Sequence, residues 1–186
     1  MSLFPDLSYP SGFQYIDQVI DEGEERRLLE FLSSEQVDPV AINGYPGKRL
    51  IKYYGVRYDE NDLRPSGETS PLPLQLIALK DSLATRFGLN SEPFVQALLN
   101  KYPQGSTIGW HRDRPWFGND VIGVSLASAC RMQLRLRSPT GFERAEVVLP
   151  PRSAYLLSGD SRWKWQHSIP AVDAERWSIT FRSLRK

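Results

Sequence analysis

Residues 94–113 read FVQALLNKYPQGSTIGWHRD, and the character of the chain changes at this stretch. From here onward, short runs of apolar and β-branched residues are separated by turn residues, a pattern that is typical of β-strands. We predict strands within 94–102, 106–113, 121–128, 131–137, 145–150, 153–159 and 176–184. Strands at such regular spacing favour a sandwich or a barrel.

Two helices are predicted before this run of strands. The segment 21–34 begins with a capping residue, Asp21, and continues with leucines at helical spacing. The segment 73–89 also repeats apolar residues at helical spacing, and Gly88 is the residue expected to end it. Two helices followed by strands indicate an α+β domain whose helices brace one face of the β-structure.

Composition narrows the class of protein. The 186 residues fit a single domain, 1–186, and a net charge of +1 gives no global field that would attract nucleic acid. One cysteine excludes an internal disulfide framework and fits a reducing compartment. No apolar stretch approaches the roughly 20 residues of a membrane span, and the start lacks the pattern of a secretory signal. We therefore expect a soluble, cytoplasmic protein with no membrane partner; nothing in the sequence indicates its oligomeric state.

The two histidines of the chain are His111 and His167. His111 and Asp113 occupy positions i and i+2 of a predicted strand, so their side chains share one face. With His167 they would supply two imidazoles and one carboxylate, the facial triad of non-haem Fe(II) oxygenases. The alternative is that the H-x-D tripeptide arose by chance and both histidines lie at the surface.

The last predicted strand carries an alternating pattern, RWSITFR at 176–182. Its polar face carries Arg176, Ser178, Thr180 and Arg182. In an open sheet this face would meet solvent, but in a closed barrel it would point inward. A buried arginine needs an anion, and a carboxylate suits its planar fork. Asn100 and Tyr102 likewise share a face of an earlier strand, so a metal site beside an anion pocket implies an acidic co-substrate that chelates the metal.

The order of these motifs along the chain matches that of a known protein family. The stretches 100–113 and 176–182, with His167 between them, resemble the AlkB family of Fe(II)- and 2-oxoglutarate-dependent dioxygenases. The resemblance is specific from about residue 95 to 183 and looser before that. It implies a double-stranded β-helix (jelly-roll) catalytic core at 93–186, with N-terminal helices and a nucleotide-recognition lid within 1–92. It also implies Fe(II), 2-oxoglutarate and dioxygen as the cofactor and co-substrates.

The resemblance assigns roles to individual residues. The iron ligands would be His111, Asp113 and His167. Arg176 would pair with the distal carboxylate of 2-oxoglutarate, assisted by Asn100 and Tyr102. Arg182 matches a second arginine, near the metal-side carboxylate and the substrate. Ser178 stands where the family often has asparagine, which leaves its contact with the co-substrate open.

The resemblance also suggests the substrate. Residues 48–62, KRLIKYYGVRYDEND, resemble the family's nucleotide-recognition lid and interleave basic with aromatic residues, which suits phosphate contact and base stacking. The candidate substrate contacts are Lys52, Tyr54, Arg57, Trp116 and Phe117. The alternatives are an amphipathic hairpin packed on the core and ordinary packing of the loop that holds the two aromatic residues.

A second basic stripe lies at 131–137, RMQLRLR, where arginines alternate with apolar residues. It is either a solvated sheet face or a surface that contacts nucleic acid. The segment 161–168, SRWKWQHS, places basic and aromatic residues beside His167, and part of it is expected to line the entrance of the site.

The predicted activity is oxidative demethylation of alkylated nucleobases in DNA or RNA, single strands included, as in the repair of alkylation damage. One alternative is a hydroxylase or demethylase of the same chemistry acting on tRNA or protein. Another is a catalytically inactive barrel that binds nucleic acid. Formation of succinate from 2-oxoglutarate would distinguish an enzyme from such a binding module.

Overall fold

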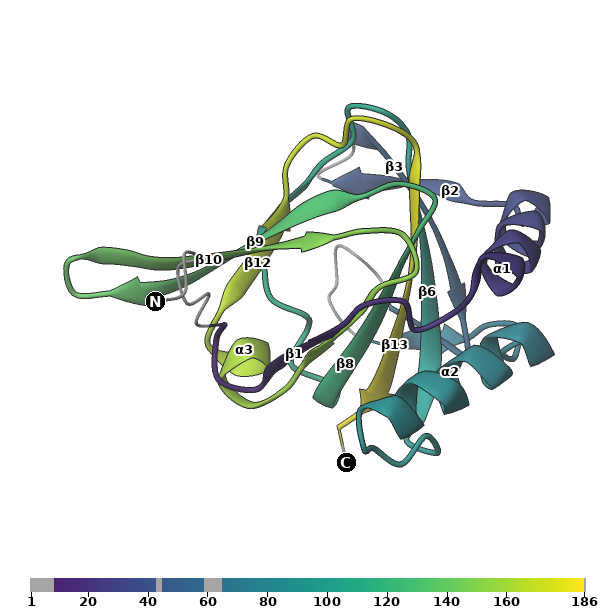
Figure 1. The fold of residues 1–186 in the computed structure, drawn as a ribbon, viewed down its shortest axis with the longest axis horizontal. Helices are drawn as coiled ribbons and strands as arrows, with labels where there is room; N and C mark the ends of the chain where they lie inside the picture. The colour runs from purple at the N-terminus through teal and green to yellow at the C-terminus, as the bar shows by residue number, and fades with distance from the viewer. Residues whose placement is uncertain (1–8, 43–44, 59–64, 186) are drawn as a thin grey trace.

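Figure 1 shows the fold in a computed structural model, which describes residues 9–42, 45–58 and 65–185. In these ranges the strands form three antiparallel sheets. The largest contains, from edge to edge, β1 (Phe13–Ile16), β11 (Ala154–Leu157), β8 (Phe117–Leu126), β13 (Arg176–Leu184), β6 (Phe94–Tyr102), β3 (Tyr45–Tyr54) and β2 (Asp38–Ile42). The second contains β10 (Gly141–Leu149), β9 (Cys130–Ser138), β12 (Gln166–Ile169) and β7 (Ile108–His111). The third pairs β4 (Val56–Tyr58) with β5 (Pro65–Glu68).

The two larger sheets pack against each other through an apolar layer. Tyr102 and Leu157 from the seven-stranded sheet belong to the same buried cluster as Met132 and Leu149 from the four-stranded sheet. Burying one face of each sheet against the other is the arrangement of a sandwich or jelly roll. The regular strand spacing therefore led to the correct architecture for the second half of the chain.

The two predicted helices cover the other face of the seven-stranded sheet (Figure 1). Helix α1 (Glu22–Ser34) begins after Asp21, whose carboxylate accepts a hydrogen bond from the backbone N–H of Glu24 at 2.7 Å. Helix α2 (Leu74–Arg86) presents leucines to the same apolar cluster as α1. A short third helix, α3 (Gly159–Trp163), was not predicted. Among the described residues, no helix has the length and apolar character that crossing a bilayer requires.

The N-terminal half contributes more to the sheets than predicted. Strands β1, β2 and β3 all join the seven-stranded sheet, so the β-structure does not begin at residue 93. The hairpin considered as an alternative for residues 48–62 is not seen in the described residues, where β3 pairs with β6 and β2, and β4 pairs with β5. Residues 59–62 of that segment lie outside the described residues.

Two further differences concern the second half. Strand β8 begins at Phe117 rather than near residue 121, so the loop after the H-x-D motif is shorter than expected. Strand β12 was not predicted at all, although it carries His167. Its residues, QHSI, include a single apolar residue, so no alternation of apolar and polar residues marks it as a strand.

Candidate active site

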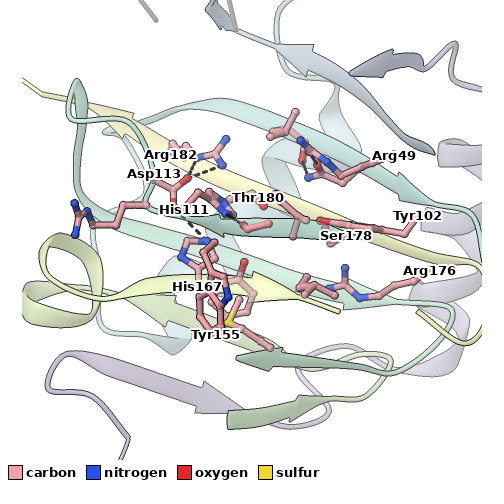
Figure 2. Close-up of a pocket in the computed structure, with 18 of the residues that line it drawn as sticks. Arg49, Tyr102, His111, Asp113, Tyr155, His167, Arg176, Ser178, Thr180 and Arg182 are labelled. Carbon is pink, nitrogen blue, oxygen red and sulfur yellow. Dashed lines mark hydrogen bonds and ion pairs between the residues drawn. The ribbon is translucent and has the colours of Figure 1, made fainter. Parts of the chain in front are cut away.

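The polar face of β13 lines a cavity of about 270 Å³ between the two larger sheets (Figure 2). Arg176 and Arg182 are only 1% and 7% exposed, and Ser178 and Thr180 between them are also buried. The intervening Trp177, Ile179 and Phe181 belong to the apolar cluster under the helices. The alternation in RWSITFR therefore separates core residues on one side of the strand from cavity residues on the other.

The two histidines meet because their strands pair. His111 on β7 and His167 on β12 are register partners across the antiparallel ladder, and their ring centroids are 4.2 Å apart. Asp113 follows β7, and its Oδ2 lies 3.9 Å from Nε2 of His167. Figure 2 shows these three side chains gathered at one end of the cavity. His167, which is distant in sequence, is thus brought beside His111 and Asp113.

Asp113 is held as a carboxylate. Its Oδ1 accepts hydrogen bonds from Nε and Nη2 of Arg182, at 2.7 and 2.6 Å. Burial alone would raise the pKa of Asp113, but the charge of Arg182 and the two neighbouring imidazoles outweigh it, so the pKa lies below its usual range. This end of the cavity therefore keeps one negative charge at neutral pH.

The two imidazoles are held neutral. Burial, together with His111 nearby, lowers the pKa of His167 to about 3. Burial also lowers the pKa of His111, whose Nδ1 lies 2.8 Å from the carbonyl oxygen of Gly109. The neutral form of imidazole is the one that binds metals.

This donor set suits Fe(II), since two neutral imidazoles and one carboxylate match the ligands of non-haem iron oxygenases. In the described ranges, however, no three His, Cys, Asp or Glu side chains already converge as a metal-ligand group. Oδ1 of Asp113 is engaged by Arg182, and its Oδ2 lies 3.9 Å from Nε2 of His167. The ligand assignment stays a prediction.

The opposite end of the cavity is built around Arg176 (Figure 2). Its Nε donates to Oγ of Ser125 at 3.1 Å, and its guanidinium lies 5.0 Å from the ring centroid of Tyr102. Its Nη1 is buried and has no hydrogen-bond partner among the described residues. Leaving such a group unsatisfied is costly, so this end of the cavity is suited to an anion, and a carboxylate fits the guanidinium fork.

Comparison with known proteins agrees with this geometry. Residues 15–182 match the family model described as the 2OG-Fe(II) oxygenase superfamily. The chain belongs to this superfamily. It is an AlkB-like Fe(II)- and 2-oxoglutarate-dependent dioxygenase, as the sequence predicted, and it uses Fe(II), 2-oxoglutarate and dioxygen.

Relatives and solved structures add detail. The dioxygenase is 27% identical to uncharacterized protein L905 of Acanthamoeba polyphaga mimivirus, over 95% of this chain and 86% of the relative. It is 28% identical to the tRNA (carboxymethyluridine(34)-5-O)-methyltransferase ALKBH8 of Macaca fascicularis over 86% of this chain, but spans only 24% of that protein. The structure of OsALKBH1 superposes with a TM-score of 0.73 at 15% identity, covering 94% of this chain and 98% of the other. A Pseudomonas putida prolyl-4-hydroxylase superposes with a TM-score of 0.62 at 16% identity, covering 94% of this chain and 93% of the other. These likenesses confirm the α+β double-stranded β-helix fold.

The other residues predicted to bind the co-substrate line the same cavity, but none of them forms a hydrogen bond with Arg176 among the described contacts. Asn100 is opposite Ser178 in the β6–β13 register, and its side-chain oxygen accepts a hydrogen bond from Arg49. Arg49, considered beforehand only as part of the lid, therefore lines the cavity of the dioxygenase. The roles of Asn100, Tyr102 and Ser178 in binding 2-oxoglutarate stay predictions.

Tyr155 is a cavity residue that sequence reasoning missed. Burial raises the pKa of its hydroxyl, so the phenol stays protonated. A Cβ at Gly123 would come within 2.3 Å of this ring, so glycine is required where β8 passes beneath it. Gly123 lies inside a predicted strand, and a glycine in that position indicates that another group approaches the backbone closely.

Two of the predicted substrate contacts face the wrong side of β3. Lys52 and Tyr54 both bond to the carboxylate of Glu35, at the C-terminal end of α1, and Tyr54 is only 5% exposed. Positions i and i+2 share a face, and this face packs under the helices, away from the cavity. The stacking role predicted for Tyr54 is wrong in this placement, because its ring belongs to the apolar cluster.

The remaining candidates also lie outside the cavity lining. Arg57 is exposed on β4. Phe117 is 1% exposed and packs below Arg182, with 5.0 Å between guanidinium and ring centroid, so it cannot stack on a base. Trp116 is half-buried, and its Nε1 is buried without a hydrogen-bond partner in the described residues.

Arg162 fixes the loop that carries Asp113. It belongs to the segment 161–168, part of which was expected to line the entrance, but it is 2% exposed and stacks against the ring of Trp163 at 4.2 Å. Its guanidinium donates to four backbone carbonyls, those of Asp113, Arg114, Phe117 and Gly118, at 2.8–3.3 Å. A single buried side chain thus satisfies the acceptors of the turn between the H-x-D motif and β8.

We expect Arg162→Met to lower the free energy of unfolding by about 3 kcal/mol or more, because each buried acceptor left unsatisfied costs about 1–3 kcal/mol. Urea unfolding measures this. We also expect Mn(II) to bind about 10–100-fold more weakly, the usual effect of removing a group that orients a ligand. Arg131→Met, at an exposed site on β9, is the matched control and should change stability by no more than about 0.5 kcal/mol. Wild-type stability and metal affinity in Arg162→Met would show that the loop does not depend on this arginine.

Proposed function

We propose that this dioxygenase oxidatively demethylates alkylated bases in single-stranded DNA or RNA. The observation that carries the proposal is the charge of the cavity, whose lining contains one carboxylate, that of Asp113, and five arginines. The arginines are Arg49, Arg112, Arg114, Arg176 and Arg182. The two from β13 serve Asp113 and the expected co-substrate. The other three are more exposed and are suited to the phosphates of a nucleic acid.

In this proposal His111, Asp113 and His167 hold Fe(II), and Arg176 holds the distal carboxylate of 2-oxoglutarate. Bound iron, 2-oxoglutarate and dioxygen supply the oxidation that hydroxylates an N-methyl group, which leaves as formaldehyde while 2-oxoglutarate becomes succinate and carbon dioxide. The protein keeps Asp113 ionised through Arg182 and both imidazoles neutral through burial. Because the cavity lies between the two sheets, a base must leave its stack to enter it, which costs least in a single strand.

The names of relatives support a nucleic-acid substrate. The dioxygenase is 30% identical to the alkylated DNA repair protein ALKBH8 homolog of Arabidopsis thaliana, over 97% of this chain and 57% of the relative. It is also 30% identical to the RNA demethylase ALKBH9B of that plant, over 47% of this chain and 18% of the relative. Since these relatives extend well beyond the matched region, the choice between DNA and RNA belongs to experiment.

The test is mass spectrometry of oligonucleotides incubated with the protein, Fe(II) and 2-oxoglutarate under air. The panel contains N-methylated DNA, N-methylated RNA and unmodified tRNA, and Asp113→Ala supplies the background. Demethylation removes the mass of one CH₂ and releases one formaldehyde and one succinate. A gain of one oxygen on tRNA would instead indicate a hydroxylase of the same chemistry. Succinate with no change in any nucleic acid would be turnover of 2-oxoglutarate uncoupled from these substrates and would overturn the proposal.

A further inference from the structure

The outer face of the four-stranded sheet carries a second basic surface, apart from the cavity. Strands β9 and β10 form a hairpin that projects beyond the rest of the fold (Figure 1). On this hairpin the side chains of Met132, Leu134 and Val147 are buried toward the core, so the alternating residues point outward. The outward residues include four arginines, Arg131, Arg135, Arg137 and Arg144. The stripe predicted at 131–137 therefore lies on a sheet face directed to solvent.

An aromatic and cationic stack joins this face to the cavity. The guanidinium of Arg135 lies 4.3 Å from the ring centroid of Trp110 and 4.6 Å from that of Phe142. Trp110 is on β7 and lines the cavity, whereas Phe142 is on β10 near the hairpin turn. Nε of Arg135 donates to Gln166 on β12 at 2.8 Å, which fixes the guanidinium between the two rings. The stack therefore crosses all four strands of the sheet.

The positive charge on this surface is not balanced by ion pairs. Among the described residues, Arg131, Arg135, Arg137 and Arg144 form no salt bridge, although basic residues elsewhere, such as Arg152 and Lys164, do. The outward carboxylate of the hairpin, Glu146, accepts a hydrogen bond from Gln133 at 3.3 Å. Because the net charge of the whole chain is only +1, this surface is more positive than the protein as a whole. Guanidinium groups without a carboxylate partner, beside the exposed ring of Phe142, suit a polyanion that also carries flat apolar surfaces.

We propose that this surface, from Trp110 at the cavity to Phe142 near the hairpin turn, binds the nucleotides that flank the reacting base in a single strand. The arginines contact phosphates, and the ring of Phe142, which is 40% exposed, stacks on an unpaired base. A duplex does not fit this role, because its bases are already stacked on one another. The inference rests on the proposed function, and it specifies which surface of the protein carries the strand to the cavity.

The test is the affinity of the protein for a dye-labelled single strand of about 12 nucleotides, made once as RNA and once as DNA. Binding is followed by fluorescence anisotropy across a salt series, with no iron or 2-oxoglutarate added. The double variant Arg137→Ala/Arg144→Ala should weaken binding about tenfold or more at low salt. It should also flatten the salt dependence by roughly 0.7 for each phosphate that the variant no longer neutralises. Both side chains are exposed, so the fold should survive their removal.

Phe142→Ala should weaken binding about fivefold or more and leave the salt dependence unchanged, since it removes stacking and no charge. The matched controls are Arg26→Ala/Arg27→Ala on α1 and Leu74→Ala on α2, which remove exposed side chains of the same kinds elsewhere. Wild-type affinity and salt dependence in the hairpin variants would overturn the inference. Preference for RNA or for DNA would show which single strand the surface selects.

A second readout separates this inference from the proposed function. Turnover of a methylated dinucleotide, which is too short to reach the hairpin, should be unchanged in the hairpin variants, whereas turnover of the long methylated strand should fall with its affinity. If the wild-type protein demethylates no oligonucleotide but the hairpin variants lose strand binding, the proposed demethylation is overturned and the binding surface is retained. If the hairpin variants bind and demethylate long strands as well as the wild-type protein does, the binding surface is overturned and the proposed demethylation is retained.

Discussion

Asp113→Ala is expected to abolish Mn(II) binding and the formation of succinate from 2-oxoglutarate. Among the residues that line the cavity, Asp113 supplies the one carboxylate. Removing a ligand should weaken metal binding by more than the roughly 10–100-fold that follows removal of an orienting group. Calorimetric titration with Mn(II), which needs no turnover, measures the affinity, and Asp173→Ala at an exposed site is the matched control. Wild-type Mn(II) affinity in folded Asp113→Ala would place the metal elsewhere.

The same substitution should also destabilise the protein. Arg182 is 7% exposed and would lose the carboxylate that balances its charge, and breaking a buried ion pair in this way costs about 3–5 kcal/mol. His167→Ala provides the complementary variant, because it removes a proposed ligand without leaving a buried charge. A loss of Mn(II) binding in His167→Ala, with the thermal unfolding transition retained, would attribute the loss to ligation and not to unfolding.

The parts of the fold that the sequence predicted well are those where one strand or helix has two different environments. Strands β6 and β13 have the bounds that were predicted, and in β13 every second residue is apolar because it meets the helices while the others line the cavity. Helix α1 begins where its capping aspartate predicted. In each case the spacing of apolar residues along the sequence shows which face of the strand or helix is packed in the core.

The parts that were missed depend on contacts between distant segments. Which face of β3 meets the cavity is decided by its register with β6, and a shift by one residue would exchange Tyr54 and Tyr53 between the two sides. Nothing local indicates that Arg162 is buried, since arginine is ordinarily exposed and its four acceptors lie far away in sequence. The convergence of His111 and His167 was predicted from chemistry and family resemblance, because the strand that carries His167 has one apolar residue in four and shows no strand pattern.

Arg176 offers the clearest test of the co-substrate site. Arg176→Ala should weaken 2-oxoglutarate binding about tenfold or more, since a charge-assisted hydrogen bond contributes about 1.5–3 kcal/mol. Arg176→Lys should not restore the affinity, because an ammonium group cannot reproduce the planar fork or its packing over Tyr102. Titration of the Mn(II)-loaded protein with 2-oxoglutarate, without oxygen, gives the affinities, and Arg86→Ala at an exposed site on α2 is the matched control.

Thermal unfolding distinguishes a binding role of Arg176 from a structural one. Because Nη1 of Arg176 is buried without a partner in the described residues, Arg176→Met should leave the stability of the ligand-free protein unchanged or raise it. Wild-type protein should instead gain about 2.7 kcal/mol when 2-oxoglutarate is present at about 100 times its dissociation constant, a gain that Arg176→Met should lack at the same concentration. If the ligand-free variant loses stability and keeps its response to 2-oxoglutarate, Arg176 supports the fold and another group binds the distal carboxylate. Since removing Asp113 should destabilise the ligand-free protein and removing Arg176 should not, these two charges are expected to differ in kind. The charge of Asp113 is balanced by Arg182 within the protein, and the charge of Arg176 is balanced by the co-substrate.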